Sequence, residues 1–382
     1  MTSAVAEPSS TATQVAEAPL VLAVEATRVA NDVRGIGRYV RALLPRLLRQ
    51  RPGLRIILFV KRRRDIERVQ HRLASLGLAS DRVMVRHIRE MKHCQADLFW
   101  YPWNIASAPP ERGAVVVTIH DVAPLVLPDP RRRKWWKNFR WRRRYLATAK
   151  RATLIVTVSE FTASEVHRLL GVPRARLRVT HLAADDFDIP PAARDDDALA
   201  RLGVRTPFVL AVGAAERRKN LAFLERAMHR VVGSIPEVTL VLAGPRRSDR
   251  RPSSDPSWQR TLGFVSEEDL ASLYRAARAL IAPSSYEGFG LPVLEAMRLG
   301  TPVICAGASS LPEVAGDAAQ WVVPDDDAQL ASTICRVVGD DGLRDTMRAA
   351  SIAQALRFSW DETARLTLAA FDDALDAARR GA

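Results

Sequence analysis

The stretch SSYEGFGLPVLEAMRLGTPVICAGASSLPE, residues 284–313, decides how the rest of the sequence is interpreted. It places Glu287 and Glu295 eight positions apart around a glycine-rich turn, with Pro292 near the start of a predicted helix. Free N–H groups at a helix start attract anions, and both carboxylates can accept hydrogen bonds from the hydroxyls of one ligand. The stretch therefore predicts a site for a phosphate beside a polyol, and a nucleotide sugar contains both.

Apolar runs typical of buried strands alternate with helical patterns along the chain. They occupy residues 20–25, 54–60, 97–102, 114–120, 153–158, 207–213, 238–244, 279–283 and 301–305. This alternation predicts an α/β protein with parallel sheets covered on both faces. We expect two tandem Rossmann-like domains, residues 19–190 and 205–357, joined by a linker over 191–204. Residues 358–382 contain an amphipathic helix that must dock on a core.

The 382 residues are enough for two domains, and the charge is divided unevenly between the two halves. Residues 1–190 carry a net charge of +17 and residues 191–382 one of −3, which gives +14 for the chain. The first half should therefore face an acidic partner. Anionic lipid, a lipid-linked diphosphate and nucleic acid are the candidates.

Three further features bear on where the protein works. The cysteines, Cys94, Cys305 and Cys335, lack the paired spacing of zinc or redox motifs, which favours a reducing cytoplasm. Residues 1–18 are rich in Ala, Ser and Thr and are predicted to be a disordered tail rather than a signal peptide. No stretch reaches the roughly 18 apolar residues that span a bilayer.

Two loops between a predicted strand and a helix are candidate phosphate sites. Gly35 and Gly37 precede a helix that starts near Arg38; without a third glycine they make no dinucleotide fingerprint, and a plain tight turn is the alternative. The run RRK, residues 217–219, places cations where a parallel strand ends, so they can neutralise a diphosphate leaving group. A solvated basic turn is the alternative for this second loop.

His120 ends a predicted strand, where binding sites concentrate, although a lone histidine is commonly hydrogen-bonded in a core. The sequence has no H-E-x-x-H motif or cluster of histidines and carboxylates, and we predict no metal.

The run RRRKWWKNFRWRRRYL, residues 131–146, combines cations with aromatic side chains. On a helix Trp135, Trp136, Phe139 and Leu146 share one face, with cations on the flanks. The candidate membrane or acceptor surface consists of Trp135, Trp136, Arg142, Arg143 and Arg144. Such a helix suits an anionic membrane surface. A helix with its aromatic residues in the core is the main alternative. Nucleic acid is a third, which we do not expect to be the partner.

Together these motifs resemble the retaining glycosyltransferases of family 4, which have the GT-B fold, and in particular the bacterial O-antigen and exopolysaccharide mannosyltransferases. The resemblance rests on GIGRY, TIHD, TVSEFT, VGAAERRKN, LGFVSEEDLASLY, EGFGLPVLEAM and the final SWDETA helix. Glu313, in SSLPEVAG, matches a position common in that subgroup. Many members have an arginine after the strand glycine, whereas Ala214 follows Gly213 here, so diphosphate binding must depend on the RRK run.

The resemblance implies a cleft between the domains and a final helix that crosses back to the first one. It implies no metal or other cofactor and a nucleotide-sugar donor, GDP-mannose or a UDP-sugar, in the second domain. The acceptor in the first domain would be a saccharide, free or linked to polyprenyl diphosphate, in cell-surface polysaccharide synthesis. The enzyme would be a metal-independent hexosyltransferase on the inner face of the plasma membrane. The alternatives are a GT-B epimerase, which needs no acceptor, and a non-catalytic basic protein that binds membrane or nucleic acid and keeps a relic pocket.

Site residues follow from the same resemblance, position by position. Glu287 would contact the donor sugar, Glu295 the ribose, and His120 the transferred sugar near the reaction centre. Lys219, helped by Arg218 beside Gly213, would bind the diphosphate, and the Gly35–Gly37 loop would lie beside the phosphates. Sugar and phosphate would also be held by the backbone N–H groups of Gly288, Phe289, Gly290 and Leu291.

Overall fold

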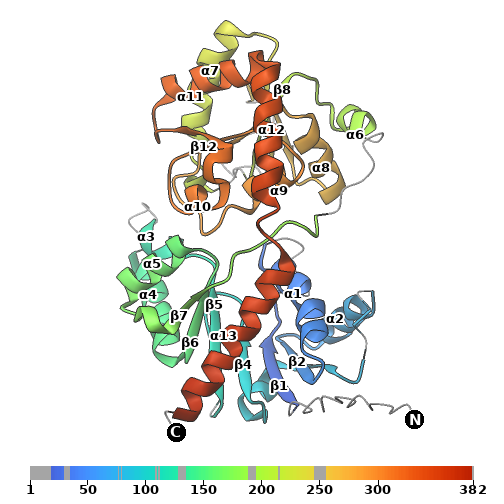
Figure 1. Ribbon diagram of the computed structural model, residues 1–382, viewed down its shortest axis with the longest axis vertical. Helices are drawn as coiled ribbons and strands as arrows, with labels where there is room; N and C mark the ends of the chain where they lie inside the picture. The colour runs from blue at the N-terminus through green and yellow to red at the C-terminus, as the bar shows by residue number, and fades with distance from the viewer. Residues whose placement is uncertain are drawn as a thin grey trace, which may run out of the picture.

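A computed structural model describes most of the chain as two parallel sheets with helices on both faces (Figure 1). The described residues are 19–29, 35–75, 77–78, 80–107, 110, 112–127, 135–187, 195–213, 216–244 and 255–380; for residues 36 and 135–138 only the backbone is described. The predicted tail, residues 1–18, lies outside them.

The first sheet has the strand order β3-β2-β1-β4-β5-β6-β7, and all neighbouring strands are parallel. Its strands are β1 (Leu20–Glu25), β2 (Leu54–Val60), β3 (Val83–His87), β4 (Leu98–Tyr101), β5 (Ala114–Ile119), β6 (Leu154–Thr157) and β7 (Leu177–Val179). The helices of this half are α1 (Ile36–Gln50), α2 (Arg64–Ser75), α3 (Ala123–Val126), α4 (Trp135–Arg151) and α5 (Glu160–Leu170), with 3-10 turns η1 (Ile88–His93) and η3 (Arg174–Arg176). All six residues of β5 are buried, as expected for a central strand covered on both faces.

The second sheet repeats this architecture with the order β10-β9-β8-β11-β12-β13. Its strands are β8 (Phe208–Val212), β9 (Thr239–Ala243), β10 (Gln259–Gly263), β11 (Ala279–Ala282), β12 (Val303–Ala306) and β13 (Ala319–Val322). The helices are α6 (Asp195–Leu202), α7 (Leu221–Ser234), α8 (Glu267–Ala276), α9 (Leu291–Arg298), α10 (Leu311–Ala315), α11 (Asp327–Gly339) and α12 (Asp341–Ala355), with 3-10 turns η5 (Arg217–Lys219) and η7 (Gly316–Ala318).

The predicted linker contains helix α6. Residues 188–194 lie outside the described part of the chain, but 195–202 are helical, with three aspartates in the first turn, where the helix dipole favours negative charge. Arg275 of α8 pairs with Asp195, its Nε lying 2.6 Å from Oδ2, and Leu199 is buried. This helix therefore packs on the second domain.

The final helix, α13 (Trp360–Arg380), crosses back and runs along the first domain, as the family resemblance implies (Figure 1). Trp360 and Phe371 are fully buried, and the Phe371 ring lies 5.6 Å from that of Trp100. Ion pairs to the first domain flank this contact, including one of 2.9 Å between Arg46 Nε and Asp361 Oδ1. The apolar face of α13, which the sequence predicts must dock on a core, therefore packs on the core of the first domain.

Candidate functional site

A cleft of about 500 Å³ lies between the two domains and collects most of the predicted site residues. From the first domain it is lined by Gly35 and His120, and from the second by Gly213, Arg218, Lys219, Glu287, Gly288, Phe289, Gly290, Leu291 and Glu295. Gly37 is buried within α1 and is not among the lining residues. The topology explains the convergence, because loops at the carboxyl ends of parallel strands meet at one edge of a sheet.

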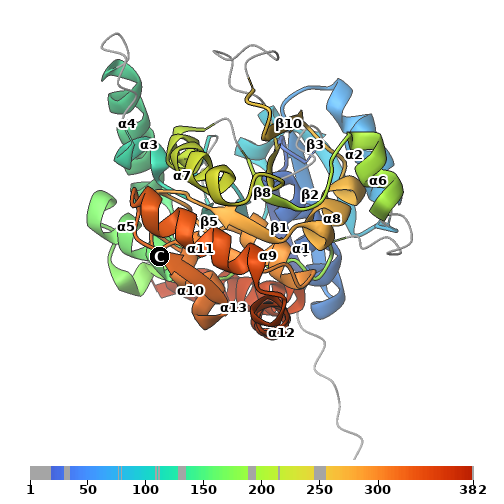
Figure 2. The same cartoon turned by 90° about the horizontal axis from the view of Figure 1, so that it is seen from above.

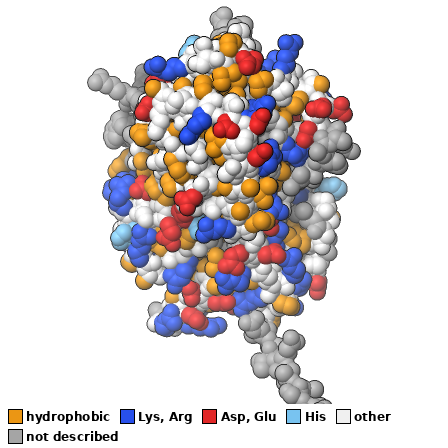
Figure 3. All heavy atoms as spheres, turned by 45° about the horizontal axis from the view of Figure 1, so that its top comes forward, with side chains coloured by type: hydrophobic (Ala, Val, Ile, Leu, Met, Phe, Trp, Pro, Cys, Tyr) orange, Lys and Arg blue, Asp and Glu red, His pale blue; other side chains and the backbone are white. Residues whose placement is uncertain are grey.

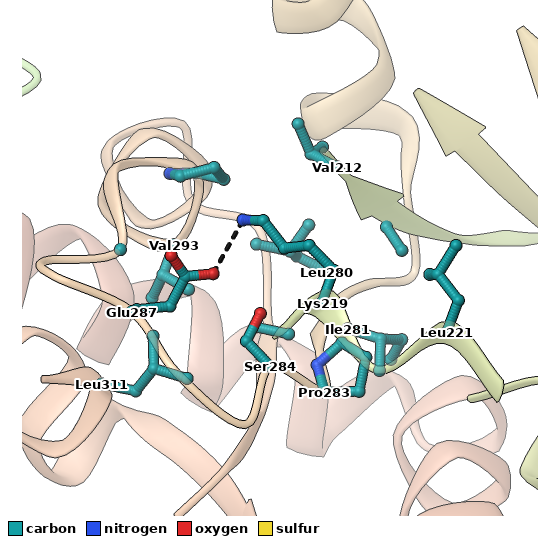
Figure 4. A pocket seen from close by; sticks show the side chains of 14 residues that line it. Val212, Lys219, Leu221, Leu280, Ile281, Pro283, Ser284, Glu287, Val293 and Leu311 are labelled. Carbon is teal, nitrogen blue, oxygen red and sulfur yellow. Dashed lines mark ion pairs between the residues drawn. The ribbon is translucent and has the colours of Figure 1, made fainter. Parts of the chain in front are cut away.

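Glu287 is the centre of a compact charge cluster. Lys219 Nζ lies 2.7 Å from its Oε1 (Figure 4). Arg218 Nη1 lies 2.6 Å from its Oε2. Glu287 as a whole residue is only 6% exposed. Burial opposes its ionisation, but Lys219 and Arg218 outweigh burial and hold the pKa of Glu287 below the ordinary value. The site therefore keeps a buried, ionised carboxylate between two cations.

A small cavity of about 20 Å³ lies against this cluster, lined by Lys219, Ser284 and Glu287 among others (Figure 4). That is room for about one water molecule. The larger cleft is the part of the site with room for a substrate.

The glycines of the loop before α9 have steric reasons to be glycine. Gly290 caps α9 with φ at 106°, and a Cβ at Gly288 would overlap the carbonyl oxygen of His120. Ser159 Oγ and Thr162 Oγ1 donate to the Gly288 carbonyl at 2.6 and 3.0 Å. The loop is thus held against the first domain.

Glu295 takes part in an ionic bridge between the domains, which the sequence did not predict. It pairs with Arg38 Nη1 and accepts a hydrogen bond of 3.1 Å from the Tyr274 hydroxyl. Arg38 Nη2 lies 2.8 Å from Asp186 Oδ1. Arg38 follows the Gly35–Gly37 loop directly, and this position was the one signal that could have identified it.

His120 has a defined tautomer. Its Nε2 lies 2.8 Å from the Pro102 carbonyl oxygen, which can only accept, so Nε2 carries the hydrogen and Nδ1 is left as an acceptor. Burial lowers the pKa of His120 to about 4, and the ring is therefore neutral at pH 7. The sequence left two alternatives for His120, a hydrogen bond in the core and a place in a binding site. The structure shows both, because the ring bonds to Pro102 and also lines the cleft.

Glu313, on α10, reaches across to the start of α5 in the first domain. Its Oε1 accepts from the Glu160 N–H at 2.7 Å and lies 2.6 Å from His181 Nε2, while its Oε2 accepts from the Phe161 N–H at 3.2 Å. Burial opposes ionisation, yet His181 and these N–H groups hold the pKa of Glu313 below the ordinary value. One domain thus caps a helix of the other.

Helix α4, predicted to meet a membrane or a core, lies at one side of the molecule (Figure 2). The side chains of Trp135 and Trp136 lie outside the described residues, whereas Phe139 is 54% exposed. Residues 142–144, all arginine, are exposed. Phe139 therefore does not belong to the core, whereas Tyr145 is buried in the core of the first domain and Trp141 and Leu146 pack against it. The core alternative thus holds for part of this run.

Two properties of the described residues bear on membranes and metals. Within that part of the chain, no helix is both long and apolar enough to cross a bilayer. Across the same residues, no group of three or more His, Cys, Asp or Glu side chains is arranged to hold a metal ion.

Comparison with known proteins agrees with the fold. Residues 33–186 match the sequence profile of Glycosyltransferase Family 4, and residues 200–354 that of Glycosyl transferases group 1. O-antigen chain mannosyltransferase B of Escherichia coli is 35% identical over 273 residues, or 67% of this chain and 69% of that protein. The serotype-specific mannosyltransferase WbdA of Escherichia coli is 28% identical over 274 residues, which are 67% of this chain but 33% of WbdA.

Solved structures extend the likeness to the whole architecture. The crystal structure of Anabaena HepE in complex with UDP-glucose matches with a TM-score of 0.69 at 17% identity, covering 91% of this chain and 98% of HepE. Both domains and the returning helix are thus accounted for by one fold. The chain belongs to glycosyltransferase family 4, and it is a retaining hexosyltransferase with the GT-B fold.

Proposed function

We propose that this enzyme transfers mannose from GDP-mannose to a saccharide acceptor during the synthesis of a cell-surface polysaccharide. The observation that carries the proposal is the cluster of Glu287, Lys219 and Arg218 in a cleft large enough for a nucleotide sugar. The choice of mannose is supported by the 35% identity to an O-antigen mannosyltransferase.

The charges of the cluster suit departure of a nucleoside diphosphate. As the bond from the anomeric carbon to the phosphate oxygen breaks, negative charge grows on the diphosphate, and preorganised cations stabilise it. Arg218 also pairs with Glu216, so Lys219 is the stronger candidate for the phosphate contact. The N–H groups at the start of α9, from Gly288 to Leu291, would hold the sugar and the phosphate.

The remaining cleft residues suit binding of the sugar and the ribose. Glu287, fixed as an acceptor of hydrogen bonds, would hold hydroxyls of the transferred sugar, and Glu295 those of the ribose. Nδ1 of the neutral His120 ring would accept a further hydrogen bond from the sugar. None of these roles needs a protein nucleophile.

The configuration at the anomeric carbon is retained because the acceptor hydroxyl attacks from the face that the phosphate leaves. The acceptor hydroxyl forms its bond to the anomeric carbon as the phosphate leaves, and its proton passes to the departing phosphate oxygen. Closure of the domains would exclude water and so limit hydrolysis.

A panel of nucleotide sugars in a thermal-shift assay tests the donor. GDP-mannose at a hundred times its dissociation constant should stabilise the protein by about 2.7 kcal/mol, and UDP-glucose by much less. A larger shift with UDP-glucose, the ligand in the HepE structure, would contradict GDP-mannose as the donor. The assignment as a transferase would still hold. An epimerised sugar nucleotide formed without acceptor would contradict transfer itself.

We also propose that the acceptor is linked to a lipid and that the enzyme binds an anionic membrane surface peripherally. The exposed Phe139 and the arginines at 142–144 of α4 support this, because exposed aromatic and cationic side chains together suit a headgroup region.

A further inference from the structure

Arg38 lies where the two domains meet, with its guanidinium between a carboxylate of each. Its Nη1 pairs with Glu295 Oε1 of α9 in the second domain, and its Nη2 lies 2.8 Å from Asp186 Oδ1 in the first. The residue belongs to the first turn of α1 and is only 7% exposed. A guanidinium can bridge two carboxylates because its N–H groups form a rigid fork, which an ammonium group lacks.

The carboxylate of Glu295 is held by a donor on each of its oxygens. Arg38 donates to Oε1, and the Tyr274 hydroxyl donates to Oε2 at 3.1 Å. Tyr274 is fully buried in the second domain, whereas Arg38 comes from the first. A carboxylate can accept about four hydrogen bonds, so these two donors orient it without by themselves using up its capacity. The orientation of Glu295 therefore depends on both domains.

Arg38 is itself fixed near the segments that join the domains. Its guanidinium carbon lies 5.3 Å from the centroid of the buried Phe187 ring. Asp186 Oδ1, which accepts from Arg38, also accepts from Trp360 Nε1 at 2.6 Å. Asp186 comes just before the segment that leads to α6, and Trp360 begins α13, where the chain has returned to the first domain. The arginine that holds Glu295 is thus anchored at both chain crossings.

We propose that Arg38 is a positioning residue for donor binding, which orients the Glu295 carboxylate so that the hydroxyls of the donor ribose can donate to it. The inference rests on the proposed function, in which Glu295 holds the ribose, and adds a residue of the first domain to that contact. Arg38 and Glu295 both line the cleft. Without Arg38, the carboxylate loses one of the two donors that orient it and can turn away from the position that suits the ribose.

Calorimetric titration with GDP and with 2′,3′-dideoxy-GDP, which lacks both ribose hydroxyls, tests the proposal. The wild type should bind GDP about thirtyfold more tightly, because a buried carboxylate left without its hydroxyl partners is costly. Arg38→Met should reduce this ratio to about threefold by weakening GDP, with dideoxy-GDP bound nearly as in the wild type. A purely structural role would weaken both nucleotides equally and leave the ratio unchanged.

Two further variants support the comparison. Arg38→Lys keeps the buried positive charge and should fold even if Arg38→Met does not, but an ammonium group cannot bridge both carboxylates, and the ratio should fall to about tenfold. Arg46→Met is the matched control, because Arg46 lies on the same helix and pairs with Asp361 of α13 but is not among the residues that line the cleft. It should leave the ratio unchanged.

The outcomes separate this inference from the proposed function. If the wild type binds UDP and not GDP, the proposed donor is wrong, and the same comparison with UDP and its dideoxy form still tests Arg38. Equal binding of the two nucleotides by the wild type would overturn the ribose contact and this inference with it. An unchanged ratio in both Arg38 variants would overturn the positioning role alone. An equal fall in Arg46→Met would also overturn it, since any loosening between α1 and α13 would then have the same effect.

Discussion

At the scale of single residues, the site is built on buried charges and on one half-buried neutral base, His120. Glu287 keeps its charge because Lys219 and Arg218 lie within 3 Å, whereas His120 stays neutral because burial outweighs its hydrogen bond to Pro102. Such buried groups respond strongly to loss of a partner and to pH, which makes them good test positions.

The pair of Lys219 and Glu287 gives the first prediction. Lys219→Met should lower kcat/KM at least a hundredfold, about 2.7 kcal/mol of transition-state stabilisation, because the diphosphate loses its main cation. It should also lower the thermal stability, because Glu287 loses one of its two cationic partners. Adding Glu287→Gln should restore stability but not activity, which steady-state kinetics and thermal melts would show. A double variant no more stable than the single one would contradict the buried ion pair.

His120 gives a prediction about pH. Its pKa is about 4 in the folded protein against 6.5 ordinarily, so between these values the unfolded chain binds more protons. The free energy of unfolding should therefore fall as the pH drops from 6.5 towards 4, by at most about 3 kcal/mol from this residue, and should not respond to it above 6.5. Urea unfolding at pH 7, 6 and 5 should show a shallower decline for His120→Gln. Equal slopes would mean that His120 is not held neutral.

At the scale of elements, the central strands were predictable and the edge strands were not. Every apolar run expected as a strand forms one, to within two residues at each end. The four strands without such a run, β3, β7, β10 and β13, are the edge strands of the two sheets. An edge strand is less buried than a central one and needs no continuous apolar run, as QRTLG in β10 illustrates.

The same limit applies to the site. Local spacing could single out Glu287, Glu295 and the RRK run as candidates, because each motif lies within one loop and the helix after it. Both glutamates, Arg218 and Lys219 line the cleft. Arg38 pairs with Glu295, which is 257 residues further along the chain, and no local pattern reports such a pair. Glu313 stood out by resemblance, but its partners on α5 and at His181 depend on how the domains meet.

The capping of α5 by Glu313 gives a prediction at this scale. Glu313→Gln keeps the shape of the side chain but removes the negative charge that faces His181 and the start of α5. That charge contributes about 1 kcal/mol. The closed arrangement should then be about fivefold less favoured, with a similar rise in the donor KM and a larger radius of gyration in small-angle scattering. Glu160→Gln, on the first turn of the same helix, is the control. If both variants behave alike, the contact of Glu313 with the first domain does not stabilise the closed arrangement.

At the scale of the whole molecule, positive charge is concentrated in the first half of the chain, but it is not a uniform field. On the face shown in Figure 3, basic and acidic side chains are interspersed. Net charge alone would attract any polyanion weakly, whereas α4 places exposed arginines beside an exposed aromatic ring. Membrane binding should therefore depend on where the charge lies and not on how much there is.

Two triple variants with the same charge change separate these possibilities. Replacing Arg142, Arg143 and Arg144 with Glu should weaken binding to vesicles with 30% anionic lipid by at least a hundredfold, since each basic residue near the surface contributes about 1 kcal/mol. The same change at the exposed residues Arg62, Arg63 and Arg64 should have a much smaller effect. Both variants should keep the thermal shift caused by the donor. Because salt screens exposed charges, wild-type binding should also fall between 50 and 300 mM salt. Equal losses in the two variants would mean that the first domain is attracted by its overall charge, and unchanged binding in the α4 variant would exclude that helix as the membrane contact.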